Sequence, residues 1–126
     1  MNVTSSLKKT YMNWLPAIGM MVIIFISSST PGRVVDASPF ASPLAQIRGH
    51  MVLFFLLCLS YYIATKNIFI SILLTVFYGV ADELHQIFTP WRSPSLFDVK
   101  VDTLAALLAG GVLWILPKRL KNWLTR

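Results

Sequence analysis

The chain has 126 residues, of which 56% are hydrophobic and 13% charged, and its mean hydropathy is +0.66. A soluble domain of this size could not bury so much apolar side chain in one core, so the composition excludes an ordinary soluble protein. The net charge of +6 favours membrane orientation over nucleic-acid binding, because the basic residues neither share one face nor alternate with aromatic residues. We therefore expect no nucleic-acid partner.

Four apolar stretches predict membrane-spanning helices. They cover residues 11–26, 51–64, 68–81 and 101–116. Each is near the lower limit of the roughly 17–25 residues that a helix needs to cross a bilayer, and each is apolar on all faces. The first stretch follows Lys8 and Lys9 and ends in serines, so a cleaved secretory signal is an alternative. We favour a retained span, because the run is longer than a typical signal core.

The segments between these stretches have turn-forming sequences. Residues 30–46 hold three prolines and predict an irregular loop, whereas residues 65–67 predict a tight turn. The prolines within residues 88–94 exclude a regular helix there. Ser95 then predicts the N-cap of the last helix, with Asp98 three residues later as an approximate capping box.

The positions of lysine and arginine predict that both termini are cytoplasmic. With four spans, seven basic residues lie on one side: Lys8, Lys9, Lys66, Lys118, Arg119, Lys121 and Arg126. Four lie on the other: Arg33, Arg48, Arg92 and Lys100. The richer side is expected to be cytoplasmic. The sequence thus predicts an all-α integral membrane four-helix bundle, with a cytoplasmic tail at residues 1–10, a transmembrane domain at 11–116 and a basic cytoplasmic tail at 117–126.

The acidic residues and the histidines all fall on the outer side of this topology. They are Asp36, Asp82, Glu83, Asp98, Asp102, His50 and His85. The second apolar stretch has 14 residues, or about 21 Å of helix, and must include residues 48–50 to cross. The third must likewise include residues 82–86, and the fourth must begin by Asp98. Ionisable groups at a membrane edge are costly, so a functional site is the default hypothesis.

Helical spacing gathers the polar residues on facing stripes. The third helix has a polar and small stripe of Thr75, Tyr78, Gly79, Asp82, Glu83, His85 and Gln86. The fourth has one of Asp98, Asp102, Ala105 and Ala109. Small residues allow helix backbones to approach closely, so we expect the two stripes to pack together with Arg48 and Arg92 as counter-charges.

Three kinds of site fit these residues. A binding site would use Ser28, Arg48, His50, Asp82, Glu83, Gln86, Arg92, Asp98 and Asp102. A catalytic site would use Asp82, Glu83 or His85 as general acid or base. A closed ion-pair network of the carboxylates with Arg48, Arg92 and Lys100 would have the same sequence pattern. No ligand spacing supports a metal site, and we expect no cofactor.

The run from Asp82 to Arg92, followed by Ser95 and Asp98, resembles the VanZ-like family of bacterial membrane proteins. That family has an acidic pair, a glutamine, a proline–x–arginine turn, and then serine and aspartate at the start of the last helix. Residues 27–31 and His50 resemble the family's end of helix one and start of helix two, so the resemblance covers about residues 20–111. Four positions depart from the pattern: Arg48, Trp91, Asp102 and Ala105. Trp91 stands where glycine is common, and Asp102 where asparagine is usual.

The resemblance implies a setting in the bacterial cytoplasmic (inner) membrane. The family is named for a protein that gives low-level resistance to the glycopeptide teicoplanin. The expected function is modulation of teicoplanin susceptibility, through an outer polar pocket that binds an amphiphilic envelope molecule. The expected partners are membrane lipid and a lipid-linked wall precursor or lipoglycopeptide. Two alternatives stay open: a small membrane enzyme acting on a lipid head group, and a structural or interaction subunit without a ligand.

Overall fold

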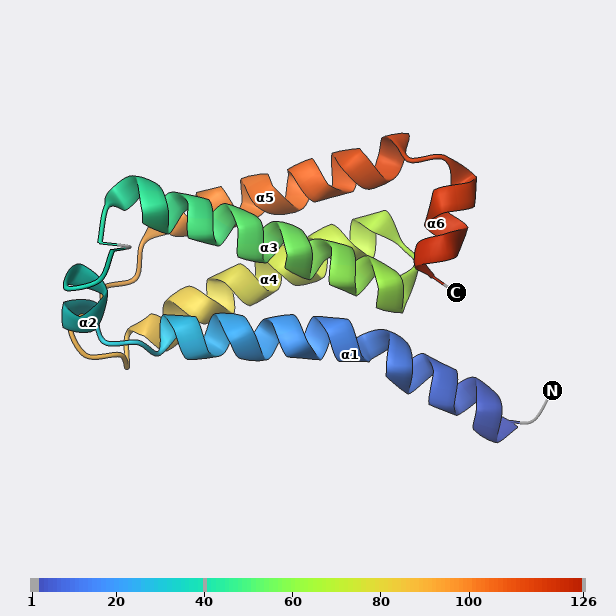
Figure 1. Ribbon diagram of the computed structural model, residues 1–126, viewed down its shortest axis with the longest axis horizontal. Coiled ribbons are helices and arrows are strands. Elements are labelled where there is room, and N and C mark those ends of the chain that lie inside the picture. Colours follow the sequence, from blue (N-terminus) through green and yellow to red (C-terminus); the bar gives the residue numbers. More distant parts are fainter. Residues whose placement is uncertain (1–2, 40, 126) are drawn as a thin grey trace.

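The structure, a computed structural model, describes residues 3–39 and 41–125, and over these residues it is all-helical, as predicted (Figure 1). The helices are α1 (Val3–Ser28), α2 (Gly32–Asp36), α3 (Pro43–Thr65), α4 (Ile68–Gln86), α5 (Leu96–Ile115) and α6 (Lys118–Leu124). The four long helices lie side by side, with α5 packed against both α3 and α4 and with α1 packed mainly against α3. Helix α2 lies at one end of the molecule, and α6 lies at the other with the start of α1.

Among the described residues, three helices are long and apolar enough to cross a membrane. They are residues Lys8–Ser28 of α1, all of α3 and all of α4. Helix α5 has a similar length of 20 residues, but its first two turns carry Asp98, Lys100 and Asp102. The membrane crossing of α5 and the cytoplasmic location of the termini stay predictions.

The ends of the long helices agree with the argument from span length. Helix α3 includes His50, α4 runs to Gln86, and α5 begins before Asp98. The turn between α3 and α4 is as tight as predicted, with Lys66 in the left-handed conformation (φ 56°). The hydroxyl of Ser95 accepts a hydrogen bond from the backbone N–H of Asp98 at 3.3 Å, which confirms Ser95 as the N-cap of α5.

The prediction of an irregular loop over residues 30–46 is wrong at two places. Residues 32–36 form α2, and α3 begins at Pro43 rather than near residue 48. Pro31 directly precedes α2 and Pro43 is the first residue of α3, positions where proline costs no helical hydrogen bond. These prolines therefore begin helices, whereas the sequence interpretation took them as helix breakers.

Both predicted tails contain helix in their described parts. Helix α1 begins at Val3, so residues 3–10 continue the first span without a break. Residues 118–124 form α6, a short helix without buried residues. Their placement in the cytoplasm stays a prediction.

The two predicted small and polar stripes pack against each other where α4 meets α5. A Cβ atom at Gly79 would lie 3.2 Å from the side chain of Asp102, and one at Gly110 would collide with Ile72. Ala105 and Ala109 of the α5 stripe are fully buried. Large apolar side chains cover the outside instead, and the most exposed in the long helices include Phe69, Phe77, Trp114 and Ile115. The close approach of α4 and α5 places Asp82 and Asp102 at the same end of the molecule.

Candidate functional site

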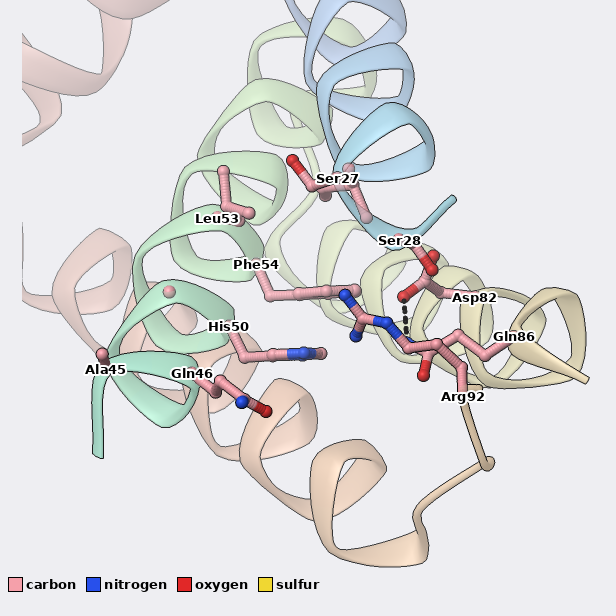
Figure 2. A pocket seen from close by; sticks show the side chains of 12 residues that line it. Ser27, Ser28, Ala45, Gln46, His50, Leu53, Phe54, Asp82, Gln86 and Arg92 are labelled. Carbon is pink, nitrogen blue, oxygen red and sulfur yellow. Dashed lines mark hydrogen bonds between the residues drawn. The ribbon is translucent and has the colours of Figure 1, made fainter. Parts of the chain in front are cut away.

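A cavity of about 380 Å³ opens between α1, α3, α4 and the loop that follows α4 (Figure 2). Its lining is Ile24, Ser27, Ser28, Ala45, Gln46, Gly49, His50, Leu53, Phe54, Asp82, Gln86 and Arg92. We name it the large cavity. Figure 2 shows the side chains of His50 and Phe54 projecting from α3 toward Arg92, with Asp82 and Gln86 on the α4 side. Leu53 and Phe54 lie about one turn further along α3 than His50, and Asp82 lies about one turn before the end of α4.

A second, smaller cavity of about 180 Å³ adjoins the first and is lined almost entirely by polar groups. We name it the polar cavity. Its lining is Gly32, Val35, Asp36, Gln46, Gln86, Trp91, Arg92, Ser93 and Asp98. Gln46, Gln86 and Arg92 line both cavities, so they form the wall between them. The site therefore has one mainly apolar compartment and one polar compartment.

His50 and Asp102 join α3 to α5 at the side of the large cavity. Nδ1 of His50 lies 2.8 Å from Oδ1 of Asp102, and since a carboxylate oxygen can only accept, the Nδ1–H donates. The Asp102 side chain is 1% exposed, and its Oδ2 has no hydrogen-bond partner within the described residues. The imidazole also stacks on Phe54, with ring centroids 5.9 Å apart and an interplanar angle of 2°. The ring is thus held in one orientation by Asp102 and Phe54, and the His50 side chain lines the large cavity (Figure 2).

The two neighbouring acids of α4 have different surroundings. Asp82 lines the large cavity, and one of its oxygens lies 3.4 Å from the amide nitrogen of Gln86. Glu83 lines neither cavity. Its Oε2 accepts a hydrogen bond of 2.5 Å from the backbone N–H of Ser95, and its Oε1 lies 3.4 Å from the Gln86 amide nitrogen. Glu83 therefore holds the loop before α5, whereas Asp82 is available to a ligand.

The loop after α4 is held against the end of α1 by backbone contacts. Nε of Arg92 donates to the carbonyl of Thr30 at 3.2 Å, and the N–H of Gly32 donates to the carbonyl of Pro90 at 3.1 Å. Trp91, which lies between Pro90 and Arg92 in the chain, has a φ of 55°, in the left-handed region. The Arg33 guanidinium lies 4.3 Å from the centroid of the Trp91 ring. These contacts fix the position of Arg92 between the two cavities.

The structure brings most of the predicted binding residues together. Ser28, His50, Asp82, Gln86 and Arg92 line the large cavity, and Asp98 lines the polar cavity with Gln86 and Arg92. Asp102 reaches the site through His50. The remaining two, Arg48 and Glu83, line neither cavity, and Arg48 is exposed on α3.

The catalytic candidate His85 faces away from these residues. Its Nε2 lies 2.9 Å from the hydroxyl of Ser29, and its ring lies 4.4 Å from the ring of Phe25 on α1. Sequence reasoning missed Gln46, which lines both cavities. Its spacing of four residues before His50 places the two on one helix face, and this was the available signal.

Arginine does not serve as the counter-charge to the carboxylates, contrary to expectation. Across residues 3–39 and 41–125, the ion pair within 4.0 Å is His50–Asp102, and no arginine or lysine makes one. Arg92 is turned to the carbonyl of Thr30, and the exposed Arg48 lies outside the cluster. The described residues also hold no group of three His, Cys, Asp or Glu side chains placed to bind a metal ion. The cluster is therefore not a closed network of arginine–carboxylate pairs.

Comparison with known proteins gives one positive finding. A family model described as VanZ/LLP1 matches residues 13–117. No curated protein and no solved structure matches the chain. The matched segment contains the greater part of α1, all of α2 to α5, and every residue that lines the two cavities. With its three apolar helices the chain is a membrane protein, and it belongs to the VanZ/LLP1 family.

Proposed function

We propose that this protein crosses the bacterial cytoplasmic membrane four times, with both termini inside, and binds an amphiphilic envelope molecule through the two cavities at its outer end. Three spans follow from length and composition. Helix α5 is the fourth in this proposal, because its 20 residues span about 30 Å and only its first two turns are charged. The more basic side, with seven lysines and arginines against four, is then cytoplasmic.

The large cavity is the observation that carries the binding function. Ile24, Leu53 and Phe54 give it an apolar part, and His50, Asp82 and Arg92 give it an ionisable part. A space that combines an apolar part with an ionisable part suits an amphiphile. Its volume of about 380 Å³ lies within the range of ligand sites. The arginine, which has no carboxylate partner among the described residues, suits phosphate or carboxylate.

The family supplies the cellular setting of this proposal. Its namesake gives low-level resistance to teicoplanin, a glycopeptide with a lipid tail. A protein that holds a lipid-linked wall precursor or a lipoglycopeptide at the outer membrane face would change how much of that molecule is free. We therefore propose that this chain modulates teicoplanin susceptibility.

Growth inhibition tests this function directly. Strains that lack the protein, or overproduce it, are compared for susceptibility to teicoplanin and to a glycopeptide without a lipid tail. We expect a shift for teicoplanin alone, lost in Arg92→Gln and kept in Arg48→Gln. The second variant is the matched control, because Arg48 is exposed and lines neither cavity. Unchanged teicoplanin susceptibility on both deletion and overproduction would overturn the proposed function.

A small membrane enzyme is the second candidate, and the His50–Asp102 pair favours it. A carboxylate that fixes an imidazole through Nδ1 leaves Nε2 free to accept a proton. In hydrolysis of a head-group ester, Nε2 would take a proton from the attacking water and return it to the leaving oxygen as the ester bond breaks. This assignment moves the catalytic role from His85 to His50.

Lipid profiling distinguishes the enzyme from the binding protein. If the protein is an enzyme, a His50→Gln strain accumulates a lipid or wall precursor that a His85→Gln strain does not. His85 is the matched control, since its Nε2 is engaged by Ser29 away from the cavity. Identical lipid profiles in wild-type and His50→Gln strains, at equal protein levels, would exclude the catalytic function.

A further inference from the structure

We propose that the two cavities select an amphiphile whose head group carries a phosphate followed by a primary ammonium group, as phosphatidylethanolamine does. This inference rests on the proposed binding function and assigns the head-group chemistry of the same site. It follows from Arg92, which lines both compartments, and from the two carboxylates without an ion-pair partner among the described residues that line the polar cavity.

Arg92 is the anion-binding part of the site. It lines both cavities, and its hydrogen bond within the described residues runs from Nε to the carbonyl of Thr30 at 3.2 Å. No carboxylate of the described residues lies within 4.0 Å of its guanidinium. The terminal nitrogens therefore keep their donors for a phosphate, which a guanidinium binds through two parallel hydrogen bonds. A phosphate on Arg92 would sit at the wall that the two cavities share.

The polar cavity carries two negatively charged side chains in addition to Arg92. Asp36 and Asp98 line it, and neither has a lysine, arginine or histidine nitrogen within 4.0 Å among the described residues. Two carboxylates without an ion-pair partner around a space of about 180 Å³ attract a cation. A primary ammonium fits, because its three N–H donors match carboxylate acceptors.

The surroundings of Trp91 argue against a quaternary ammonium such as choline. Such a group has no N–H donor and is recognised by open aromatic faces. Trp91 is the aromatic residue of the polar cavity, and the Arg33 guanidinium already lies 4.3 Å from its ring centroid. A second cation over this ring would meet a positive charge. The site thus favours ethanolamine over choline.

The two compartments also fix the order of the groups in the ligand. The large cavity continues along Ile24, Leu53 and Phe54 and would take the start of the acyl chains. Arg92, which lines both cavities, takes the phosphate, and Asp98 of the polar cavity takes the ammonium. This order, with acyl chains first, then phosphate and then ammonium, is the order of the groups in an aminophospholipid.

Native mass spectrometry of the full chain in detergent tests this inference. The protein is mixed with phosphatidylethanolamine, phosphatidylcholine and phosphatidylglycerol in equal amounts and with the same acyl chains. We expect several-fold more retained phosphatidylethanolamine than either other lipid. Arg92→Gln should lose retention of all three, whereas the control Arg48→Gln should behave as wild type.

The aspartates provide the decisive variants. Asp98→Asn, and Asp36→Asn as a second and exposed position, should lower retention of phosphatidylethanolamine to that of phosphatidylglycerol, with phosphate binding kept. Equal retention of the three lipids by wild type, or selectivity that survives both aspartate variants, overturns the inference. If teicoplanin susceptibility still depends on Arg92 in that case, the proposed function stands and only the head-group assignment fails.

Discussion

The Glu83 carboxylate on α4 accepts a hydrogen bond of 2.5 Å from the backbone N–H of Ser95, the residue that caps α5. The hydroxyl of Ser95 accepts in turn from the backbone N–H of Asp98. One buried acid thus joins the last turn of α4 to the first turn of α5, across the loop that carries Arg92. This contact explains why an acid that does not line the cavity lies beside one that does.

Loss of this contact should destabilise the loop. Glu83→Ala leaves the partly buried N–H of Ser95 without its charged acceptor, at a cost of about 1.5–3 kcal/mol. Glu83→Gln keeps an acceptor oxygen and should cost less. The apparent Tm of the detergent-solubilised protein measures both. Arg48→Ala, at an exposed position that lines neither cavity, is the control. A Tm for Glu83→Ala equal to that of wild type would show that the Ser95 contact contributes nothing.

The sequence predicted that α3, α4 and α5 extend beyond their apolar stretches, because the length of a membrane span is a physical requirement. Apolar stretches one turn too short had to continue into His50, Gln86 and Asp98. Small residues also predicted the close packing of α4 on α5, which Gly79 against Asp102 confirms. These are properties of one helix, or of two neighbouring helices, and they are readable from spacing.

The partners of the ionisable groups could not be read in the same way. His50 and Asp102 lie 52 residues apart, and which side chains meet depends on the rotation of α3 against α5. Charge alone predicted arginine partners, whereas the geometry gives Asp102 a histidine and turns Arg92 to a carbonyl oxygen. Pro31 and Pro43 were misread because proline both ends helices and begins them.

A double-mutant cycle at His50 and Asp102 should show strong coupling. Asp102→Ala leaves the Nδ1–H of His50 without its acceptor and opens a space beside Gly79, so it should lower the apparent Tm. In a His50→Ala background the same change should cost less, with a coupling of about 0.5–3 kcal/mol. The same cycle between His85 and Asp102, which the structure places in separate contacts, should be additive. Additivity in both cycles would mean that the pair does not form.

Gly32 should tolerate no side chain. A Cβ atom there would collide with the backbone of Trp91, which cannot move without breaking the hydrogen bond from Gly32 N–H to the Pro90 carbonyl. Gly32→Ala should therefore lower the apparent Tm. It should also weaken the proposed effect on teicoplanin susceptibility, since the displaced loop carries Arg92. The matched control is Gly19→Ala, where nothing lies within 4 Å. That change should be neutral or stabilising by up to about 1 kcal/mol, because alanine favours helix over glycine. A Gly32→Ala protein as stable as Gly19→Ala would contradict the docking of the loop.

Trp91 occupies a backbone conformation that favours glycine, with a φ of 55°. Residues with a Cβ rarely adopt this region, whereas glycine enters it at little steric cost. Two variants separate the contribution of the Trp91 ring to stability from the cost of its backbone conformation. Trp91→Ala and Trp91→Gly both lose the contact with the Arg33 guanidinium, but only glycine relieves the left-handed conformation. We expect Trp91→Gly to be more stable than Trp91→Ala by about 1 kcal/mol, measured by thermal or denaturant unfolding in detergent. Trp91→Gly should also be more stable than Trp91→Ala in an Arg33→Gln background, because the difference depends on φ at residue 91 and not on the Arg33 guanidinium. If alanine proves the more stable of the two, the positive φ at Trp91 does not exist in the folded protein.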